Sequence, residues 1–224
     1  MTERDGLNAP VKAPGPFVTV SREFGCGGDR LAQELLRRID ERTNERTWKY
    51  LSKHLIEESA EDLRLTADRV EDRVVEHGMN PVTNIFSGFG TSPISDEKII
   101  KTVKEIISNY AKKGHVIIVG RGGAAITQRL PNSLHIRLIA PKEWRIEELR
   151  FRREITRLQA AELIKEMDER RRLWTEHLSE TPFDNNHYDL VINCQKVKEE
   201  EMIDIILKML EDRKMIPKQV AAHH

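Results

Sequence analysis

Residues 17–30, FVTVSREFGCGGDR, give the clearest indication of the fold. Residues 17–20 are a short run of β-favouring side chains, and a glycine-rich turn follows at 25–28. Beyond the turn, Leu31 and Leu35 stand at helical spacing. A strand, a glycine turn and a helix in that order predict the first unit of an α/β domain.

The second half of the chain continues the alternation of strands and helices. We expect strands at 115–119, 134–140 and 189–193, and helices at about 142–157, 159–178 and 198–212. This pattern predicts an α/β fold, with a parallel sheet covered by helices on both faces.

The remaining segments have weaker patterns. From about 49 to 113 the pattern is helical, interrupted by a loop at 78–95 that is rich in Gly, Pro, Ser and Asn. We expect a loose leader at 1–15, one domain at 16–212 and a flexible tail at 213–224.

Composition excludes several classes of protein. The 224 residues include 37 Lys+Arg and 37 Asp+Glu, and such a balance argues against binding to nucleic-acid polymers. However, residues 121–172 hold 13 basic and 8 acidic side chains, whereas 40–78 hold 7 and 11. This uneven distribution indicates a small polyanionic ligand.

We also recognise no targeting signal and no metal-binding motif in the sequence. No apolar run approaches the roughly 20 residues of a membrane helix, and the first 15 residues are polar. Cys26 and Cys194 form no metal-binding spacing, so we expect a cytoplasmic protein and identify no metal ligands. The oligomeric state does not follow from the sequence.

Two strand ends carry residues suited to anions. At the first, backbone N–H groups of Gly25, Cys26, Gly27 and Gly28 can approach a phosphate at a helix N-terminus. Alternatively, the glycines are present only because a tight turn needs them. At the second end, 120–123 (GRGG), an arginine can grip a phosphate bidentately or belong to a structural ion pair.

The helices at 142–178 are rich in arginine. Most exposed helix arginines pair with a Glu one turn away, as Arg152 can with Glu148. We expect two or three of them to be functional and the others to form a solvated face.

Together these segments resemble the cytidylate kinase-like family of P-loop kinases, which is related to bacterial cytidylate kinases. The resemblance runs from about Phe17 to Leu210 and rests on an ordered set of motifs: SREFGCGGDRLA, VIIVGRGGAAI, HIRLIAPKEWRIEELRFRR, EMDERRRLW and YDLVINC. It implies a three-layer P-loop kinase fold with a helical acceptor-side insertion at about 49–113 and an arginine-rich lid at about 142–178.

The resemblance also implies roles for individual residues. ATP phosphates would bind at Gly25, Cys26, Gly27, Gly28 and Asp29, with Asn193 and Cys194 framing the donor base. Arg121, Gly122 and Arg145 would hold the acceptor, with Arg121 in the place of the GRD arginine. Arg22, Arg30, Arg153, Asp168 and Arg171 would be catalytic, the last two as a D-x-x-R pattern on the lid.

The chain departs from the usual P-loop pattern in two places. Against GxxxxGK[ST], Arg22 stands at the first Gly, Gly28 at the Lys and Asp29 at the hydroxyl residue. Arg22, Arg30 or a lid arginine would have to replace the missing positive charge. The GRD motif reads Gly120-Arg121-Gly122 and lacks its carboxylate.

The resemblance implies transfer of the γ-phosphoryl of ATP, with Mg²⁺, to a small phosphorylated acceptor, a nucleoside monophosphate such as CMP. Such an acceptor is already anionic, so positioning and charge stabilisation suffice. Two alternatives stay open. In the first, the chain is a nucleotide-binding sensor without catalysis. In the second, it is a kinase for a non-nucleotide small molecule.

Overall fold

The computed structural model describes residues 14–43, 46–51, 96–179 and 182–218. These ranges hold five strands and six α-helices, and one 3₁₀ helix, η1, at Asn185–His187. The strands are β1 (Phe17–Arg22), β2 (Lys49–Leu51), β3 (Val116–Val119), β4 (Ser133–Ile139) and β5 (Leu190–Asn193). The α-helices are α1 (Gly28–Thr43), α4 (Asp96–Lys113), α5 (Gly123–Thr127), α6 (Lys142–Arg153), α7 (Arg157–Leu178) and α8 (Glu199–Asp212).

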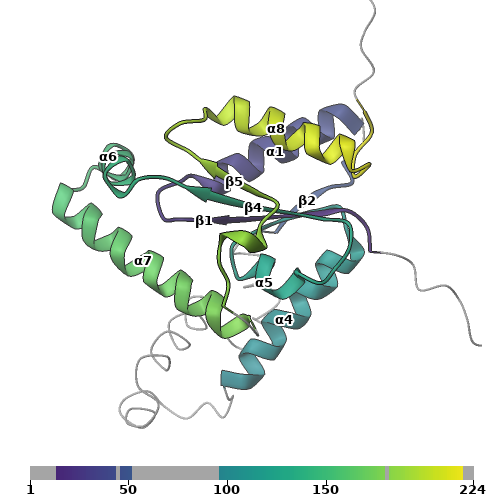
Figure 1. Cartoon of the computed structure of the whole chain (residues 1–224), viewed down its shortest axis with the longest axis horizontal. Coiled ribbons are helices and arrows are strands. Elements are labelled where there is room, and N and C mark those ends of the chain that lie inside the picture. Colours follow the sequence, from purple (N-terminus) through teal and green to yellow (C-terminus); the bar gives the residue numbers. More distant parts are fainter. Residues whose placement is uncertain (1–13, 44–45, 52–95, 180–181, 219–224) are drawn as a thin grey trace, which may run out of the picture.

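The strands form one parallel sheet in the order β2-β3-β1-β4-β5. β1 is central, with Val20 aligned to Val119 of β3 and to Ile136 of β4. Because all strands run the same way, the turns after β1 and β3 meet at one edge of the sheet (Figure 1). The α/β fold predicted from the sequence is confirmed.

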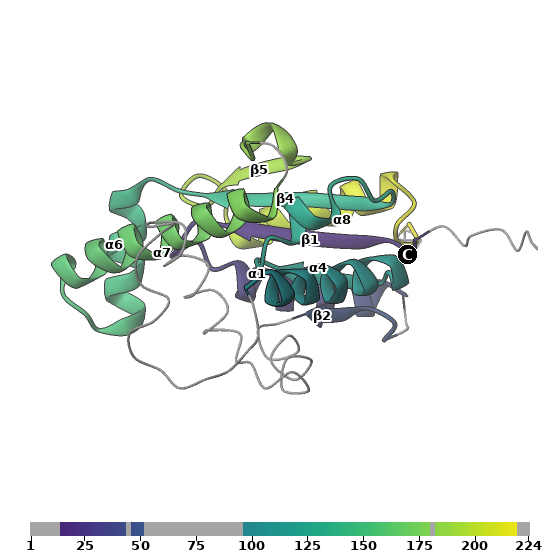
Figure 2. The same ribbon diagram turned by 90° about the horizontal axis from the view of Figure 1, so that it is seen from below.

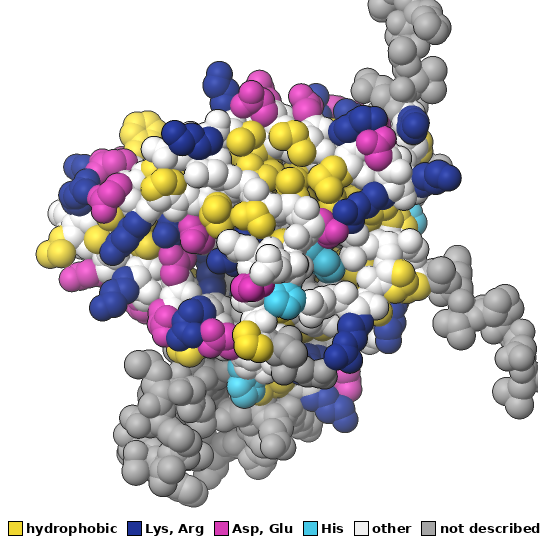
Figure 3. Space-filling view, viewed as in Figure 1, with side chains coloured by type: hydrophobic (Ala, Val, Ile, Leu, Met, Phe, Trp, Pro, Cys, Tyr) yellow, Lys and Arg dark blue, Asp and Glu magenta, His cyan; other side chains and the backbone are white. Residues whose placement is uncertain are grey.

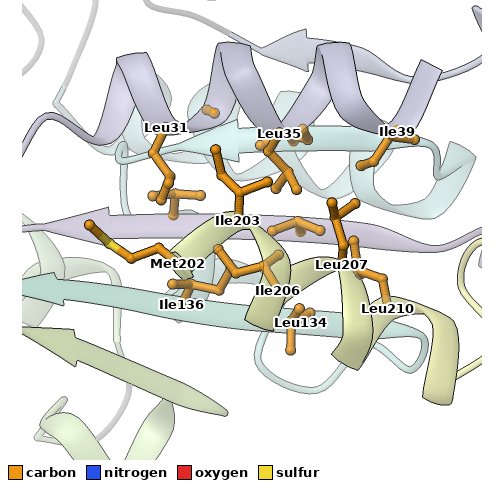
Figure 4. Packing of buried hydrophobic residues seen from close by; sticks show 14 of the residues in the cluster. Leu31, Leu35, Ile39, Leu134, Ile136, Met202, Ile203, Ile206, Leu207 and Leu210 are labelled. Atoms are coloured by element: carbon orange, nitrogen blue, oxygen red, sulfur yellow. The ribbon is translucent and has the colours of Figure 1, made fainter. Parts of the chain in front are cut away.

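One face of the sheet is covered by α1 and α8. Leu31, Leu35 and Ile39 of α1 and Ile206 of α8 pack in the same core as Ile136 of β4, which is fully buried (Figure 4). The apolar residues of α1 recur every four positions, so the whole length of the helix packs on the sheet. This core holds β1 in place from one side.

The opposite face carries α4, α5 and the C-terminal end of α7 (Figure 2). Phe17, Ile118, Ile107 and Trp174 belong to its core. Side chains at alternate positions of a strand point to opposite faces, so Thr19 and Ser21 lie on the same face as Phe17. This is the face on which the candidate site forms.

Helices α6 and α7 project beyond the sheet edge as an arm with its own small core, which includes Ile146, Leu149 and Ile164. Figure 3 shows basic and acidic side chains interspersed over the arm. The expected pair of Arg152 and Glu148 is present at 2.5 Å, and most other arginines of the arm also pair with Glu: Arg150, Arg157, Arg170 and Arg172. Most of these arginines therefore form the expected solvated face.

Three local predictions need correction. Residues 49–51 were expected in a helix but form β2, because their backbone pairs with β3 from Val116 to Ile118. The predicted strand at 115 starts at Val116, since His115 has a left-handed φ of 53°. The short α5 and η1 were not predicted. The expected loop at 78–95 and most of the acceptor-side insertion lie outside the described residues.

The domain extends beyond the predicted boundaries at both ends. The Pro14 carbonyl accepts a hydrogen bond of 2.7 Å from Asn132, so the end of the leader is held. Met215 and Ile216, placed in the tail by the sequence, are buried in the α1–α8 core. Among the described residues no helix combines the length and apolar character needed to span a membrane.

Candidate functional site

The loop between β1 and α1 contains two glycines in the left-handed backbone region. Gly25 and Gly27 have φ of +99° and +69°, a region that strains residues with a Cβ, and α1 begins directly afterwards at Gly28. A Cβ on Gly25 would meet that of Arg145 at 3.2 Å. Glycine at these positions therefore serves both conformation and close packing.

Two guanidinium groups flank this glycine loop. A Cβ on Gly27 would lie 3.5 Å from Arg152 Nη1 and 3.9 Å from Arg30 Nη2. Arg30 donates to Glu199 of α8 at 2.5 Å, and Arg152 pairs with Glu148. The loop is thus bordered by positive charge from α1 and from the arm, and Arg152 was not among the predicted site residues.

The turn after β3 is left-handed throughout. Gly120, Arg121 and Gly122 have φ of 70°, 56° and 69°, and the Gly123 N–H closes the turn on the Gly120 carbonyl at 2.9 Å. A non-glycine residue in this region is uncommon and costs free energy. The turn presents Arg121 at the carboxyl edge of the sheet, next to the end of β1.

Arg22 connects the two turns. Its Cδ lies 3.1 Å from the place of a Cβ on Gly28, and its Nη1 lies 1.8 Å from the place of a Cβ on Gly120. Its Nη2 is 3.5 Å from Asp29 Oδ2. The absence of side chains at Gly28 and Gly120 therefore creates the path along which Arg22 crosses from the first turn to the second.

A cavity of about 610 Å³ opens beside Arg22, between the sheet edge and α7. Its wall includes Arg22, Asp29, Arg121 and Gly122 from the two turns, and Asp168 and Arg171 from α7. These six predicted site residues are brought together. Gly25, Cys26, Gly27 and Gly28 are not in the wall, so the glycine loop lies beside the cavity and not inside it.

The arm is fastened to the glycine loop around Phe24. Arg153 and Arg171 place their guanidinium carbons 5.3 and 5.1 Å from the centre of the Phe24 ring. Arg171 also donates to the carbonyl of Arg22 at 3.1 Å, and Asp168 accepts from the Phe24 N–H at 2.7 Å. The predicted catalytic residues Arg153, Asp168 and Arg171 thus fix the arm against the loop.

Arg145 has a different place from the one expected of an acceptor-binding residue. It is only 6% exposed, it is absent from the cavity wall, and its guanidinium binds Asp168 and the carbonyls of Phe24 and Ala140. Glu23 lies 3.5 Å from its Nε. Arg145 therefore positions the loop and the arm from inside the protein, because a buried guanidinium needs such partners.

The end of β5 meets the glycine loop through two cysteines. The Cys194 thiol donates to the Cys26 carbonyl at 3.8 Å. The thiol–thiol hydrogen bond and burial raise the pKa of Cys26, and the same hydrogen bond lowers the pKa of Cys194. Asn193 caps its own turn by accepting from the Gln195 N–H at 3.0 Å. Cys194 adjoins the predicted donor loop, whereas the side chain of Asn193 binds within its own turn.

Several residues of the cavity wall were missed by the sequence reasoning. Arg137 of β4, Lys165 and Trp174 of α7, and the aromatic pair Phe183 and Tyr188 belong to it. Arg137 is a charged residue within a buried, mostly apolar strand, and this was the signal that could have revealed it. The others stand in ordinary helical or loop sequence and gave no comparable signal.

Comparison with known proteins agrees with this geometry. The model of the cytidylate kinase-like family matches residues 17–196. The chain belongs to this family. Its parallel sheet with flanking helices is the family's kinase-like P-loop fold, and the expectation drawn from the motifs is confirmed.

One solved structure shares the fold of this cytidylate kinase-like protein along most of its length. It is an uncharacterized protein from Eubacterium ventriosum, with a TM-score of 0.62, 22% identity, and coverage of 88% of this chain and 98% of that one. A shikimate kinase from Bacteroides thetaiotaomicron is similar at a TM-score of 0.48 and 14% identity, over 88% of this chain and 98% of that one.

A curated relative matches only in part. A uronate isomerase from Corynebacterium glutamicum is 29% identical over 93 residues, which are 41% of this chain and 18% of that protein. The match thus spans less than a fifth of that relative's length.

Proposed function

We propose that this protein transfers the γ-phosphoryl of ATP to a small phosphorylated acceptor, a nucleoside monophosphate such as CMP. The proposal rests on the position of Arg22, whose side chain runs from the glycine loop to the Gly120 turn and borders the cavity. A cation at this junction lies between a donor held by the loop and an acceptor held by Arg121. That is where charge builds up during phosphoryl transfer.

The donor side would consist of the glycine loop and the start of α1. The N–H groups there, the helix dipole, Arg30 and Arg152 all favour triphosphate oxygens. The missing Walker lysine is compensated best by Arg22, since Arg30 is turned toward Glu199. This choice among the arginines is supported by geometry that the sequence did not provide.

The residues at the loop also fit Mg²⁺. Mg²⁺ commonly takes one or two carboxylates and completes its shell with phosphate oxygens and water. Asp29 stands at the hydroxyl position of the P-loop pattern, its side chain is 59% exposed, and Tyr50 orients it with a hydrogen bond of 2.6 Å. When bound, Mg²⁺ would neutralise charge on the ATP phosphates, and Asp29 would be its protein ligand.

The acceptor side would be the cavity. Arg121 would hold the acceptor phosphate at the turn after β3, while Arg171 would stabilise the transferring group from the lid. Asp168 and Arg153 would act by fixing the lid, through Phe24. A phosphate oxygen is nucleophilic at neutral pH, so these residues need only position it and exclude water.

The test is a coupled ADP-release assay with CMP, UMP, AMP, GMP and non-nucleotide phosphates as acceptors. We expect turnover with a nucleoside monophosphate, and a loss on the order of 10³-fold in Arg22→Gln. Arg121→Ala should raise KM for the acceptor. Arg150→Gln is the matched control, because Arg150 pairs with Glu147 on the exposed side of the arm.

The other two hypotheses give different results in the same assay. ATP binding without turnover of any acceptor would identify a sensor. Turnover of a non-nucleotide acceptor alone would identify a kinase with another specificity. Either result would overturn the assignment to nucleoside monophosphates.

A further inference from the structure

The acidic side chains of the cavity wall are already engaged by the protein. Each of the five carboxylates accepts a hydrogen bond from a described neighbour. The pairs are Glu23 with the N–H of Ala140, Asp29 with Tyr50, Asp168 with the N–H of Phe24, and Glu169 and Glu176 with Arg172. Apart from Asp29, which is the proposed Mg²⁺ ligand, the wall therefore offers a ligand few carboxylate oxygens that are not already used.

Two donors in the same wall lack an acceptor. Arg137 Nε and Trp174 Nε1 are buried, and within the described ranges neither has a hydrogen-bond partner. Both groups donate only, since neither a guanidinium nor an indole N–H accepts. A buried donor left without an acceptor destabilises a protein by about 1–3 kcal/mol, so such groups call for a partner.

The two donors lie in different parts of the cavity wall. Trp174 Nε1 lies 3.3 Å from the place of a Cβ on Gly122, so it stands beside the Arg121 turn. Arg137 lies on β4, aligned with Ser21 of β1, and its guanidinium carbon is 5.5 Å from the centre of the Tyr188 ring. β3 and β4 flank β1, so the two strands beside which these donors lie are about 10 Å apart, two strand spacings.

We propose that Arg137 determines acceptor specificity by binding the end of the acceptor that is remote from its phosphate, while Trp174 donates to the phosphate. The inference rests on the proposed function. A guanidinium is a planar fork and matches two adjacent acceptor atoms in one plane. Such a pair is offered by a carboxylate or by the O2 and N3 atoms of cytosine.

The test measures binding by calorimetric titration of the full chain and does not require turnover. In each of two probe pairs, one member offers two adjacent acceptor atoms and the other does not. CMP has adjacent acceptors where UMP has an N–H, and 3-phosphoglycerate has a carboxylate that glycerol 3-phosphate lacks. We expect the unaltered protein to bind one preferred probe at least about tenfold tighter than its partner, and the preferred pair identifies the source of the acceptor atoms.

Arg137→Gln should weaken binding of the preferred probe about 10- to 100-fold and leave its partner's affinity nearly unchanged. Arg137→Lys keeps the charge but not the fork, and should also lose discrimination. Trp174→Phe should weaken all phosphate-bearing probes about three- to tenfold and preserve discrimination. Arg150→Gln, outside the wall, should alter neither property.

Titration of each variant with ATP serves as the check on folding, because the glycine loop lies outside the cavity wall. If Arg137→Gln does not fold, the probe affinities of Arg137→Lys and Trp174→Phe test the inference instead. Unchanged discrimination in the Arg137 variants, equal binding within both pairs, or no binding of any probe would overturn the inference. The proposed function fails separately if the protein distinguishes the probes through Arg137 but releases no ADP.

Discussion

The carboxylate of Asp168, on α7, accepts a hydrogen bond of 2.7 Å from the backbone N–H of Phe24 in the glycine loop. Its other oxygen binds the buried guanidinium of Arg145, which donates to the carbonyl of the same Phe24. One carboxylate thereby fixes the loop, the start of α6 and the middle of α7 in a single arrangement. The candidate site depends on that arrangement, since Arg171 lies one turn further along α7.

Replacing Asp168 should therefore destabilise the protein as well as weaken its function. We expect Asp168→Ala to lower the free energy of unfolding by about 2–3 kcal/mol, because it leaves Arg145 buried without its main partner. Urea denaturation measures the change. Glu166→Ala is the control, since Glu166 forms an exposed pair with Arg170 and should contribute less than about 0.5 kcal/mol. Equal effects of the two substitutions would contradict this role for Asp168.

A methyl group at Gly120 should displace Arg22. The added Cβ would fall 1.8 Å from Arg22 Nη1, and φ at Gly120 is +70°. We expect Gly120→Ala to lose most phosphoryl transfer, and to lower the free energy of unfolding by at least about 1 kcal/mol. Adding Arg22→Ala should recover part of the stability but none of the activity. A double variant no more stable than Gly120→Ala would show that the clash is unimportant.

The central architecture could be predicted because buried parallel strands have predominantly apolar sequences. β3 is a continuous apolar run and β4 is mostly apolar, and Leu31, Leu35 and Ile39 revealed the face of α1. β2 escaped because a three-residue strand has no periodicity of its own. Its extended conformation comes from pairing with β3, which lies more than 60 residues further along the chain.

Individual residues of the candidate site could be predicted, but the contacts between them could not. The glycine turns and Arg121 follow from local sequence, whereas the burial of Arg145 follows from Asp168 and Glu23, which are remote in sequence. The same holds for Arg137, whose candidacy rests on its place in the cavity wall and on an Nε without a partner among the described residues. Side-chain partners between distant segments carry no periodic signal.

Acidification should destabilise the protein through His135. Its Nδ1 is 2.8 Å from Thr19 Oγ1 in the sheet interior, and burial lowers its pKa below the usual value of 6.5, with Asp189 opposing and Arg213 reinforcing the shift. The unfolded chain then takes up this proton first as the pH falls below 6.5, so stability is lost at up to about 1.4 kcal/mol per pH unit.

Unfolding free energies at pH 7.5 and 5.5 measure this loss, compared between the unaltered protein and a Thr19→Val, His135→Leu double variant. Removing both partners leaves no unsatisfied hydroxyl, so the variant should fold and lose less stability on acidification. An identical loss in both proteins would assign the pH dependence to other groups.

The two thiols should differ in reactivity. Cys194 has a lowered pKa and is half-buried, whereas Cys26 has a raised pKa and is 7% exposed. The thiolate is the reactive form, so iodoacetamide should modify Cys194 well before Cys26. Peptide mass spectrometry over a time course resolves the two sites. Faster labelling of Cys26 would mean that the loop opens in solution and exposes it.

The phosphate-loop assignment is tested most directly at Gly27. Gly27→Val places a branched side chain at a φ of +69°, where glycine is favoured, and directs it toward Arg152 and Arg30. The backbone N–H groups and both guanidinium groups then lose their arrangement around the phosphates. We expect calorimetry to detect no ATP binding by this variant, while its affinity for acceptor probes changes little because Gly27 lies outside the cavity wall. Normal ATP binding would show that the phosphates are held elsewhere, and the donor side of the proposed mechanism would then be wrong.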